Sequence, residues 1–141
     1  MLRAFHPAHP RRPAAASVEF AIASLVFFTL IIALVDFGRA LMTSYGLVNA
    51  ARRAARVAIV PGRSNTNVTS AVTDALGRGG IPSAYATTTV KVNGTLADVS
   101  SARPGDRITV TIAIPVNQVT WLPMTRWVTG TVRGTYTLCR E

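Results

Sequence analysis

Few residues in this sequence could do chemistry. The only histidines, His6 and His9, fall within the first ten residues, and Cys139 is the only cysteine. A zinc site needs several cysteine or histidine ligands, and a nucleophilic serine or cysteine needs a nearby histidine. The acids beyond residue 60 lie in different predicted elements, so no general acid and base are paired. The sequence therefore predicts a protein that is not an enzyme and that takes no metal, cofactor or small-molecule substrate.

The one acid in an unusual place is Glu19. It stands at the edge of a run from residue 20 to residue 35 that carries no charge. A carboxylate at that edge costs on the order of a few kcal/mol in a membrane unless it has a partner or lies at the interface. The positive end of a helix macrodipole would offset about 0.3 to 1 kcal/mol of this cost. That account explains why Glu19 is tolerated, but not why small residues separate it from Arg11 and Arg12.

The apolar segment of residues 14–35 has the length of one membrane crossing. As a helix its 22 residues would measure about 33 Å, against a hydrocarbon core of about 30 Å. A cleaved signal peptide is not favoured, because the run leads into Asp36 without a small-residue cleavage site. A buried core helix is not favoured either, because a chain of 141 residues has little protein to surround it. We expect a retained transmembrane helix.

The net charge of +9 does not indicate nucleic-acid binding. Arginine supplies fourteen of the fifteen basic residues, and these are scattered along the chain without a known DNA- or RNA-binding motif. Arg3, Arg11 and Arg12 precede the apolar segment, as the positive-inside rule expects of a cytoplasmic leader. The charge pattern predicts a single-pass protein with a cytoplasmic N-terminus.

Helical periodicity continues beyond the membrane segment. Leu41, Tyr45 and Val48 recur at helical spacing, and no breaker occurs before residues 61 and 62, which are proline and glycine. The sequence predicts a leader over residues 1–14, one helix over residues 15–60 and an exported domain over residues 61–141. Small residues in the second half either allow close packing by another helix or merely favour helix formation. They are Gly38, Gly46 and the alanines at 40, 50, 51, 54, 55 and 58.

The sequence of residues 61–141 predicts a short helix followed by a small antiparallel sheet. Val68, Val72 and Leu76 would share one helix face, with Thr66 or Asn67 as the cap. Strand alternation follows in residues 88–92, 95–99, 107–114 and 130–140, with a hairpin turn at residues 93 and 94. We therefore expect an α+β fold: a long N-terminal helix, transmembrane in its first half and amphipathic in its second, packed on a small antiparallel sheet.

Two features near the C-terminus leave alternatives open. The apolar loop of residues 116–127 either forms a contact surface for a partner or membrane, or covers the end of the core. Its candidate contact residues are Trp121, Leu122, Met124 and Trp127. Cys139 is expected as a small buried hydrophobe, with an intermolecular disulfide as the alternative in an oxidising compartment.

One pattern runs through the first 62 residues: a basic leader, the VEF and DFGRA elements around the apolar run, and the following NAARRAARVAIVPG. In this pattern the sequence resembles the TadE-like pilus assembly proteins, the minor pseudopilins of tight-adherence systems. The C-terminal strands are similar to that family more weakly. The resemblance implies a pilin-like fold. The candidate helix-packing residues of this sequence are Asp36, Gly38, Arg39 and Gly46.

The resemblance also implies processing by a prepilin peptidase. Glu19 would be the fifth mature residue, which places the cut between Ala14 and Ala15, with Glu19 and Phe20 recognised in processing and assembly. Ala14 stands where related pilins commonly have glycine. The implied partners are the bacterial inner membrane, the peptidase, other pilin-like subunits and the assembly machinery, and the domain would be periplasmic or extracellular. The alternative function is an uncleaved, membrane-anchored module that binds a protein or polymer in the envelope.

Overall fold

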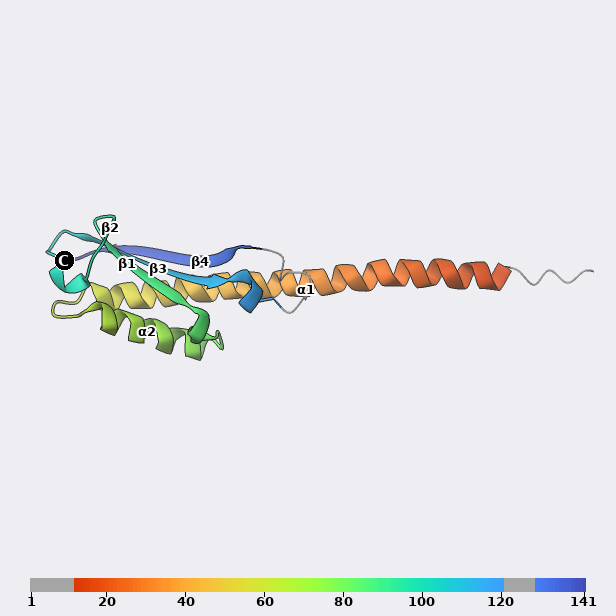
Figure 1. The fold of residues 1–141 in the computed structure, drawn as a ribbon, viewed down its shortest axis with the longest axis horizontal. Coiled ribbons are helices and arrows are strands. Elements are labelled where there is room, and N and C mark those ends of the chain that lie inside the picture. The colour runs from red at the N-terminus through yellow and green to blue at the C-terminus, as the bar shows by residue number, and fades with distance from the viewer. Residues whose placement is uncertain (1–11, 121–128) are drawn as a thin grey trace, which may run out of the picture. The chain divides into compact units, whose positions relative to one another are not determined.

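The computed structural model describes residues 12–120 and 129–141, without the side chains of residues 12–14. It contains two α-helices, α1 (Arg12–Ala58) and α2 (Asn65–Arg78), and four strands (Figure 1). The strands are β1 (Thr87–Val92), β2 (Thr95–Leu96), β3 (Arg107–Pro115) and β4 (Thr131–Cys139). Short 3-10 helices lie at Ser83–Tyr85, Val99–Ser101 and Val116–Gln118. The chain divides into two compact units, Met1–Val35 and Asp36–Glu141, with the boundary inside α1.

Helix α1 confirms the predicted long helix to within three residues at its start and two at its end. The helix contains no proline after Pro13. Alanine, leucine and arginine, all strong helix formers, dominate its second half. Gly62 follows the helix with a φ of 78°, a conformation that favours glycine. The turn at residues 61 and 62 therefore ends the helix and leads the chain into α2.

The N-cap of helix α2 lies two or three residues before the predicted cap. Ser64, rather than Thr66 or Asn67, is the N-cap, and its backbone N–H donates to Oδ1 of Asn67 at 3.0 Å. The prediction was wrong because Asn67 supports the cap from inside the first turn. The predicted inner face is confirmed, since Val68, Val72 and Leu76 are buried.

The sheet is antiparallel with strand order β2-β1-β3-β4. Between β1 and β2, Asn93 and Gly94 have φ angles of 51° and 87°, as a two-residue hairpin turn requires. The return strand is shorter than predicted, because only Thr95 and Leu96 pair with β1 before the chain turns away. In β3 the residues at 108, 110, 112 and 114 are fully buried, which confirms the predicted inner face.

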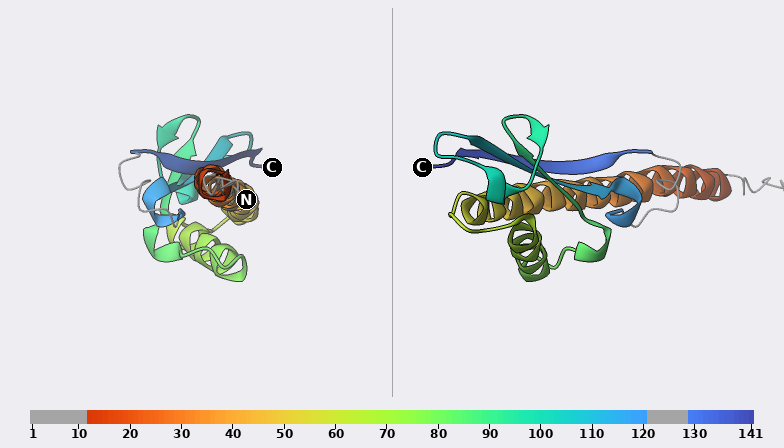
Figure 2. Two further views of the ribbon diagram at one scale, coloured as in Figure 1. Left: turned by 90° about the vertical axis from the view of Figure 1, so that its right-hand side faces the viewer. Right: turned by 60° about the vertical axis from the view of Figure 1, so that its left-hand side comes forward.

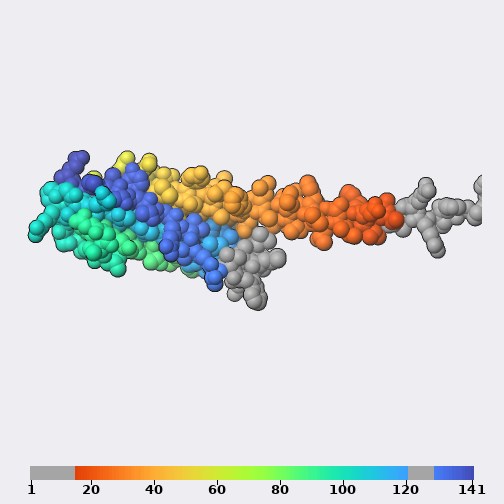
Figure 3. All heavy atoms as spheres, turned by 90° about the horizontal axis from the view of Figure 1, so that it is seen from above, coloured from red at the N-terminus to blue at the C-terminus, as the bar shows by residue number. Residues whose placement is uncertain are grey.

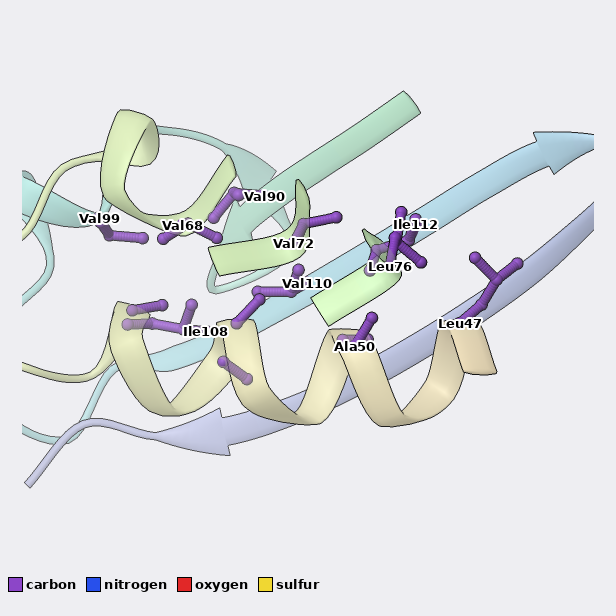
Figure 4. Packing of buried hydrophobic residues seen from close by; sticks show 14 of the residues in the cluster. Leu47, Ala50, Val68, Val72, Leu76, Val90, Val99, Ile108, Val110 and Ile112 are labelled. Carbon is purple, nitrogen blue, oxygen red and sulfur yellow. The ribbon is translucent and has the colours of Figure 1, made fainter. Parts of the chain in front are cut away.

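Both helices cover the same face of the sheet (Figure 2). Their inner side chains meet those of β1 and β3 in one apolar core, in which α2 contributes valines and a leucine and α1 contributes Leu47 and alanines (Figure 4). The confirmed fold is therefore α+β, a long apolar-to-amphipathic N-terminal helix packed on a four-stranded antiparallel sheet.

The buried face of α1 is not the one that the large apolar residues mark. Tyr45 is 71% exposed and Leu41 is exposed, whereas alanines on another face are fully buried. Leu41, Tyr45 and Val48 mark the helical period but not the packed face, which consists mostly of small residues. The buried residues of α1 are Thr43, Leu47, Ala50, Ala51, Ala54, Ala55 and Ala58.

Gly134 explains this close approach. A Cβ built on this strand residue would meet the backbone carbonyl carbon of Leu47 and lie 2.5 Å from the backbone nitrogen of Val48. Real Cβ atoms do not approach backbone that closely, so only glycine lets β4 and α1 make this contact. The helix backbone, not its side chains, packs on β4 at this point.

The other face of the sheet is open and rich in hydroxyl groups. Thr109 pairs with Thr137 at 2.9 Å between their oxygens, and Thr111 pairs with Thr135 at 3.1 Å. Such threonine pairs across antiparallel strands stabilise a sheet modestly. Cys139 lies on this face and is exposed, so the expectation of a buried cysteine was wrong. The strand register places it opposite Arg107, outside the core.

Candidate functional site

The apolar half of α1 presents bulky side chains to its surroundings. Phe20 is 74% exposed, and the other large apolar residues up to Val35 are exposed as well. Between Ala15 and Ala58 the helix reaches a mean hydropathy of 2.6 over a window of which no part is buried. By length and composition this helix is a candidate single-pass membrane anchor.

Polar side chains within this half are satisfied by the helix itself. The hydroxyl of Ser24 donates to the carbonyl of Ala21 at 3.0 Å, and that of Thr29 donates to the carbonyl of Leu25 at 2.7 Å. Bonds of this kind let serine and threonine enter a hydrocarbon environment without an unsatisfied group. The segment is therefore chemically suited to lipid apart from one residue, Glu19.

Glu19 is exposed and lies two turns inside α1, which begins at Arg12. The macrodipole acts mainly over the first turn of a helix, so it does little for this carboxylate in the intact chain. Within residues 15–120 and 129–141 the carboxylate accepts no hydrogen bond and forms no ion pair. The helix places Ala15 one turn before Glu19, and both side chains are exposed. Residues 1–11 of the leader, and the side chains of residues 12–14, lie outside the described part of the chain.

Arg39 of the DFGRA element links α1 to the segment that follows β3. Nε of Arg39 donates to the carbonyl oxygen of Val119 at 2.8 Å, across 80 positions of sequence. Asp36 is half-buried, and Gly38 has open space where a Cβ would stand. Sequence reasoning found Arg39 through its motif but missed this bond, because nothing local in the sequence links it to Val119.

The small residues of α1 pack mainly within their own domain. A Cβ on Gly46 would meet Cδ1 of Ile81, which follows α2, and the alanines from 50 to 58 are buried by the sheet and α2. These alanines lie in the core of their own domain beside α2, and the choice between packing by another helix and helix propensity alone stays a prediction. Gly38 is the exception, and its role in packing with another helix stays a prediction.

The predicted contact loop has well-defined flanks. Trp121, Leu122, Met124 and Trp127 lie outside the described residues. On either side, the N–H of Val116 donates to the carbonyl of Gly130 at 2.9 Å, and Val119 is held by Arg39. The two ends of the loop are thus brought together where β3 ends and β4 begins. The role of the tryptophans stays a prediction.

The acids of the exported part stabilise turns. The backbone N–H of Arg103 and the side-chain amide of Asn93 donate to Asp106, at 2.6 and 2.8 Å, and these bonds lower the pKa of its carboxyl. The backbone N–H of Ser100 donates to Asp98 at 2.8 Å and lowers its pKa in the same way. No cluster of metal-ligating residues occurs in the part of the chain that the structure describes.

Residues 14–56 match the protein family described as TadE-like protein. This segment is TadE-like. The match begins at the expected cleavage site, includes Glu19 and the DFGRA element, and ends just before the end of α1. It confirms the resemblance over that range and associates the chain with tight-adherence pili, whose TadE-like components are structural proteins. No curated protein and no solved structure matches the chain.

Proposed function

We propose that this protein is a minor pseudopilin that acts in the assembly or initiation of a tight-adherence pilus. Residues 15–35 would cross the bacterial inner membrane once, with the N-terminus in the cytoplasm and residues 61–141 on the opposite side. A prepilin peptidase would cut between Ala14 and Ala15. The observation that supports this proposal is an exposed carboxylate, Glu19, inside the apolar part of the TadE-like segment.

Cleavage would supply the partner that Glu19 needs. A cut after Ala14 removes three arginines and no acid, which lowers the formal charge from +9 to +6. It also creates an α-amine at Ala15, one helical turn from Glu19. In a low-dielectric environment an amine from a neighbouring subunit would neutralise the carboxylate and fix the axial register between the two helices.

The test is the N-terminus of the membrane-extracted protein, measured by mass spectrometry with and without a co-expressed prepilin peptidase. We expect an Ala15 start only when the peptidase is present. The variant Ala14→Leu should stay uncut, and Ala33→Leu, deep in the apolar segment, is the matched control that should be cut normally. An intact Met1 in the presence of the peptidase contradicts the proposal and favours the uncleaved envelope module.

Assembly is tested separately through Glu19. Glu19→Ala should still insert in the membrane, because removing a charge lowers the cost of insertion. It should fail to enter pili or pilus-assembly complexes, as judged by co-purification, whereas Glu19→Asp keeps the charge and should retain partial incorporation. Wild-type incorporation of Glu19→Ala would show that the carboxylate does not set the register.

A further inference from the structure

Strand β4 has one edge that pairs with β3 and one edge that pairs with nothing in the part of the chain described. It is nine residues long and lies last in the strand order. The register of β3 and β4 is regular from Arg107 opposite Cys139 to Pro115 opposite Thr131. A long, regular edge strand of this kind is a template for pairing with another chain.

The hydrogen bonds at the two ends of β4 show which of its backbone groups face outward. The carbonyl of Gly130 accepts from Val116 and the N–H of Arg140 donates to Asp106, at 2.9 and 2.8 Å. Because antiparallel strands alternate inward and outward groups, even-numbered residues of β4 face β3 and odd-numbered ones face away. The outward N–H and C=O groups therefore belong to Thr131, Arg133, Thr135, Thr137 and Cys139.

The usual protections of an edge strand are sparse here. Proteins shield such edges with proline, bulges, inward charges or very short strands. At the opposite edge of this sheet, β2 is two residues long, so it offers little for pairing. Strand β4 has no proline and no bulge in its register, and Arg133 is its only charged residue. Figure 3 shows β4, in blue, along the surface of the domain with α1 beside it.

The surroundings of the free edge are cationic. On the outer face of β4 stands the exposed Arg133, and on the helix side the guanidinium of Arg52 lies 4.9 Å from the ring centre of Tyr136. No acid occurs in β4 or in α1 after Asp36. Tyr136 and Leu138 are only partly buried, so a strand added at this edge would cover more of their apolar surface.

We propose that the free edge of β4 accepts an extended, acidic segment of another polypeptide as a fifth strand of the sheet. The added strand would bond to the outward groups of β4 and place carboxylates beside Arg133 on one face and Arg52 on the other. A second copy of this chain would bring the same arginines to both sides of the junction, so charge favours a different, acidic partner. This inference goes beyond the proposed function and does not rest on it.

The probe is a fluorescent nine-residue peptide in which pairs of glutamates alternate with pairs of valines, so that each face of the added strand carries carboxylates. It is added to the full-length protein in detergent micelles. We expect saturable binding, measured by fluorescence anisotropy, with slowed amide exchange at the odd-numbered residues of β4. A peptide with lysine in place of glutamate should bind at least tenfold more weakly. A glutamate peptide N-methylated at alternate residues, which lacks the donors facing the edge, should also bind at least tenfold more weakly.

The protein variant for this test is Thr135→Pro. Its lost N–H faces outward, and proline is tolerated on edge strands at such positions, so the β3–β4 ladder should survive. We expect at least a tenfold loss of peptide binding, with Thr135→Ser as the matched control that binds normally. Protection of the even-numbered amides of β4 checks that both variants are folded, and the N-methylated peptide gives the same test without altering the protein.

Three results would each overturn the inference. Equal binding of the N-methylated peptide would mean that charge alone attracts it, and absence of binding would mean that the edge does not take this class of partner. A dimer of the protein that disappears in Thr135→Pro would identify a second copy as the occupant. All three can be separated from a failure of the proposed function, because none depends on cleavage at Ala14.

Discussion

The two halves of α1 differ in which residues are exposed and which are buried. Up to Val35 the helix carries phenylalanine, leucine and isoleucine, all exposed, with Phe20 as an example. After Asp36 the buried positions are mostly alanine, and Ala54 is 0% exposed. Burial by the protein itself would predict the reverse, since large apolar residues gain most from leaving water.

The difference shows that each half of the helix fits a different environment. A lipid surrounding favours bulk and sets no fixed distance, so large side chains can point in every direction. Where strand β4 approaches the helix at Gly134, backbone meets backbone, and most buried positions in this half of the helix are alanine. Residue size along α1 therefore reports what surrounds the helix more reliably than hydrophobicity does.

Gly134→Val should have the largest effect on the second half. Its side chain would collide with the backbone of α1 at Leu47 and Val48, which cannot move aside as a flexible side chain could. We expect the free energy of unfolding of the exported domain to fall by about 3 kcal/mol, at the upper end for overpacking. Denaturant unfolding of the detergent-solubilised protein measures it.

The control for that variant is Gly130→Ala, near the start of the same strand. Its added Cβ would have Val116 Cγ2 at 3.5 Å as its nearest neighbour, an ordinary contact. It should change stability by well under 1 kcal/mol, as substitutions away from tight contacts do. Equal stability of the two variants would show that α1 and β4 do not make backbone contact at Gly134.

A pair of identical substitutions compares the two halves directly. Ala54→Leu, in the buried half, should destabilise the domain by about 1 to 3 kcal/mol through overpacking. Ala33→Leu, in the exposed half, should leave domain stability unchanged and keep the protein in the membrane fraction. Both are measured by unfolding and by fractionation. Similar losses of stability in the two variants would mean that the first half is also packed against protein.

The sequence predicted the strands better than the helix faces. Alternation alone places the buried residues of β3, because a strand has only two faces and one carries isoleucine and valine. On α1 the choice of face depends on where the sheet lies, and alanine gives no local sign of burial. Gly134 could have been noticed, since glycine within an alternating strand often marks a close backbone approach.

The sequence predicted only those candidate site residues that stand in a recognisable local pattern. Glu19 stands out because a carboxylate is costly beside an apolar run, and Arg39 because it lies in the DFGRA element. The bond from Arg39 to Val119 and the free edge of β4 depend on how distant segments meet, which no local pattern encodes. The exposure of Cys139, in contrast, follows from strand alternation, which places it on the face opposite Val132, Tyr136 and Leu138.

Acid should destabilise the exported domain and leave the apolar half of α1 unchanged. This is the smallest of the predicted effects. The lowered pKa of Asp106 means that its ionised form stabilises the fold above the pKa of an unfolded aspartate, about 3.9. That stabilisation is lost as the pH falls below this value and through the lowered pKa. Tyrosine near-ultraviolet dichroism of the domain should therefore diminish in acid before the helical signal of the apolar half does.

Asp106→Asn should be less stable than wild type at pH 7 and show a shallower loss of stability below pH 4. Asp74→Asn, which removes one charge from the exposed side of α2, is its control. An unchanged acid profile in Asp106→Asn would mean that the turn bonds of this carboxylate do not stabilise the domain.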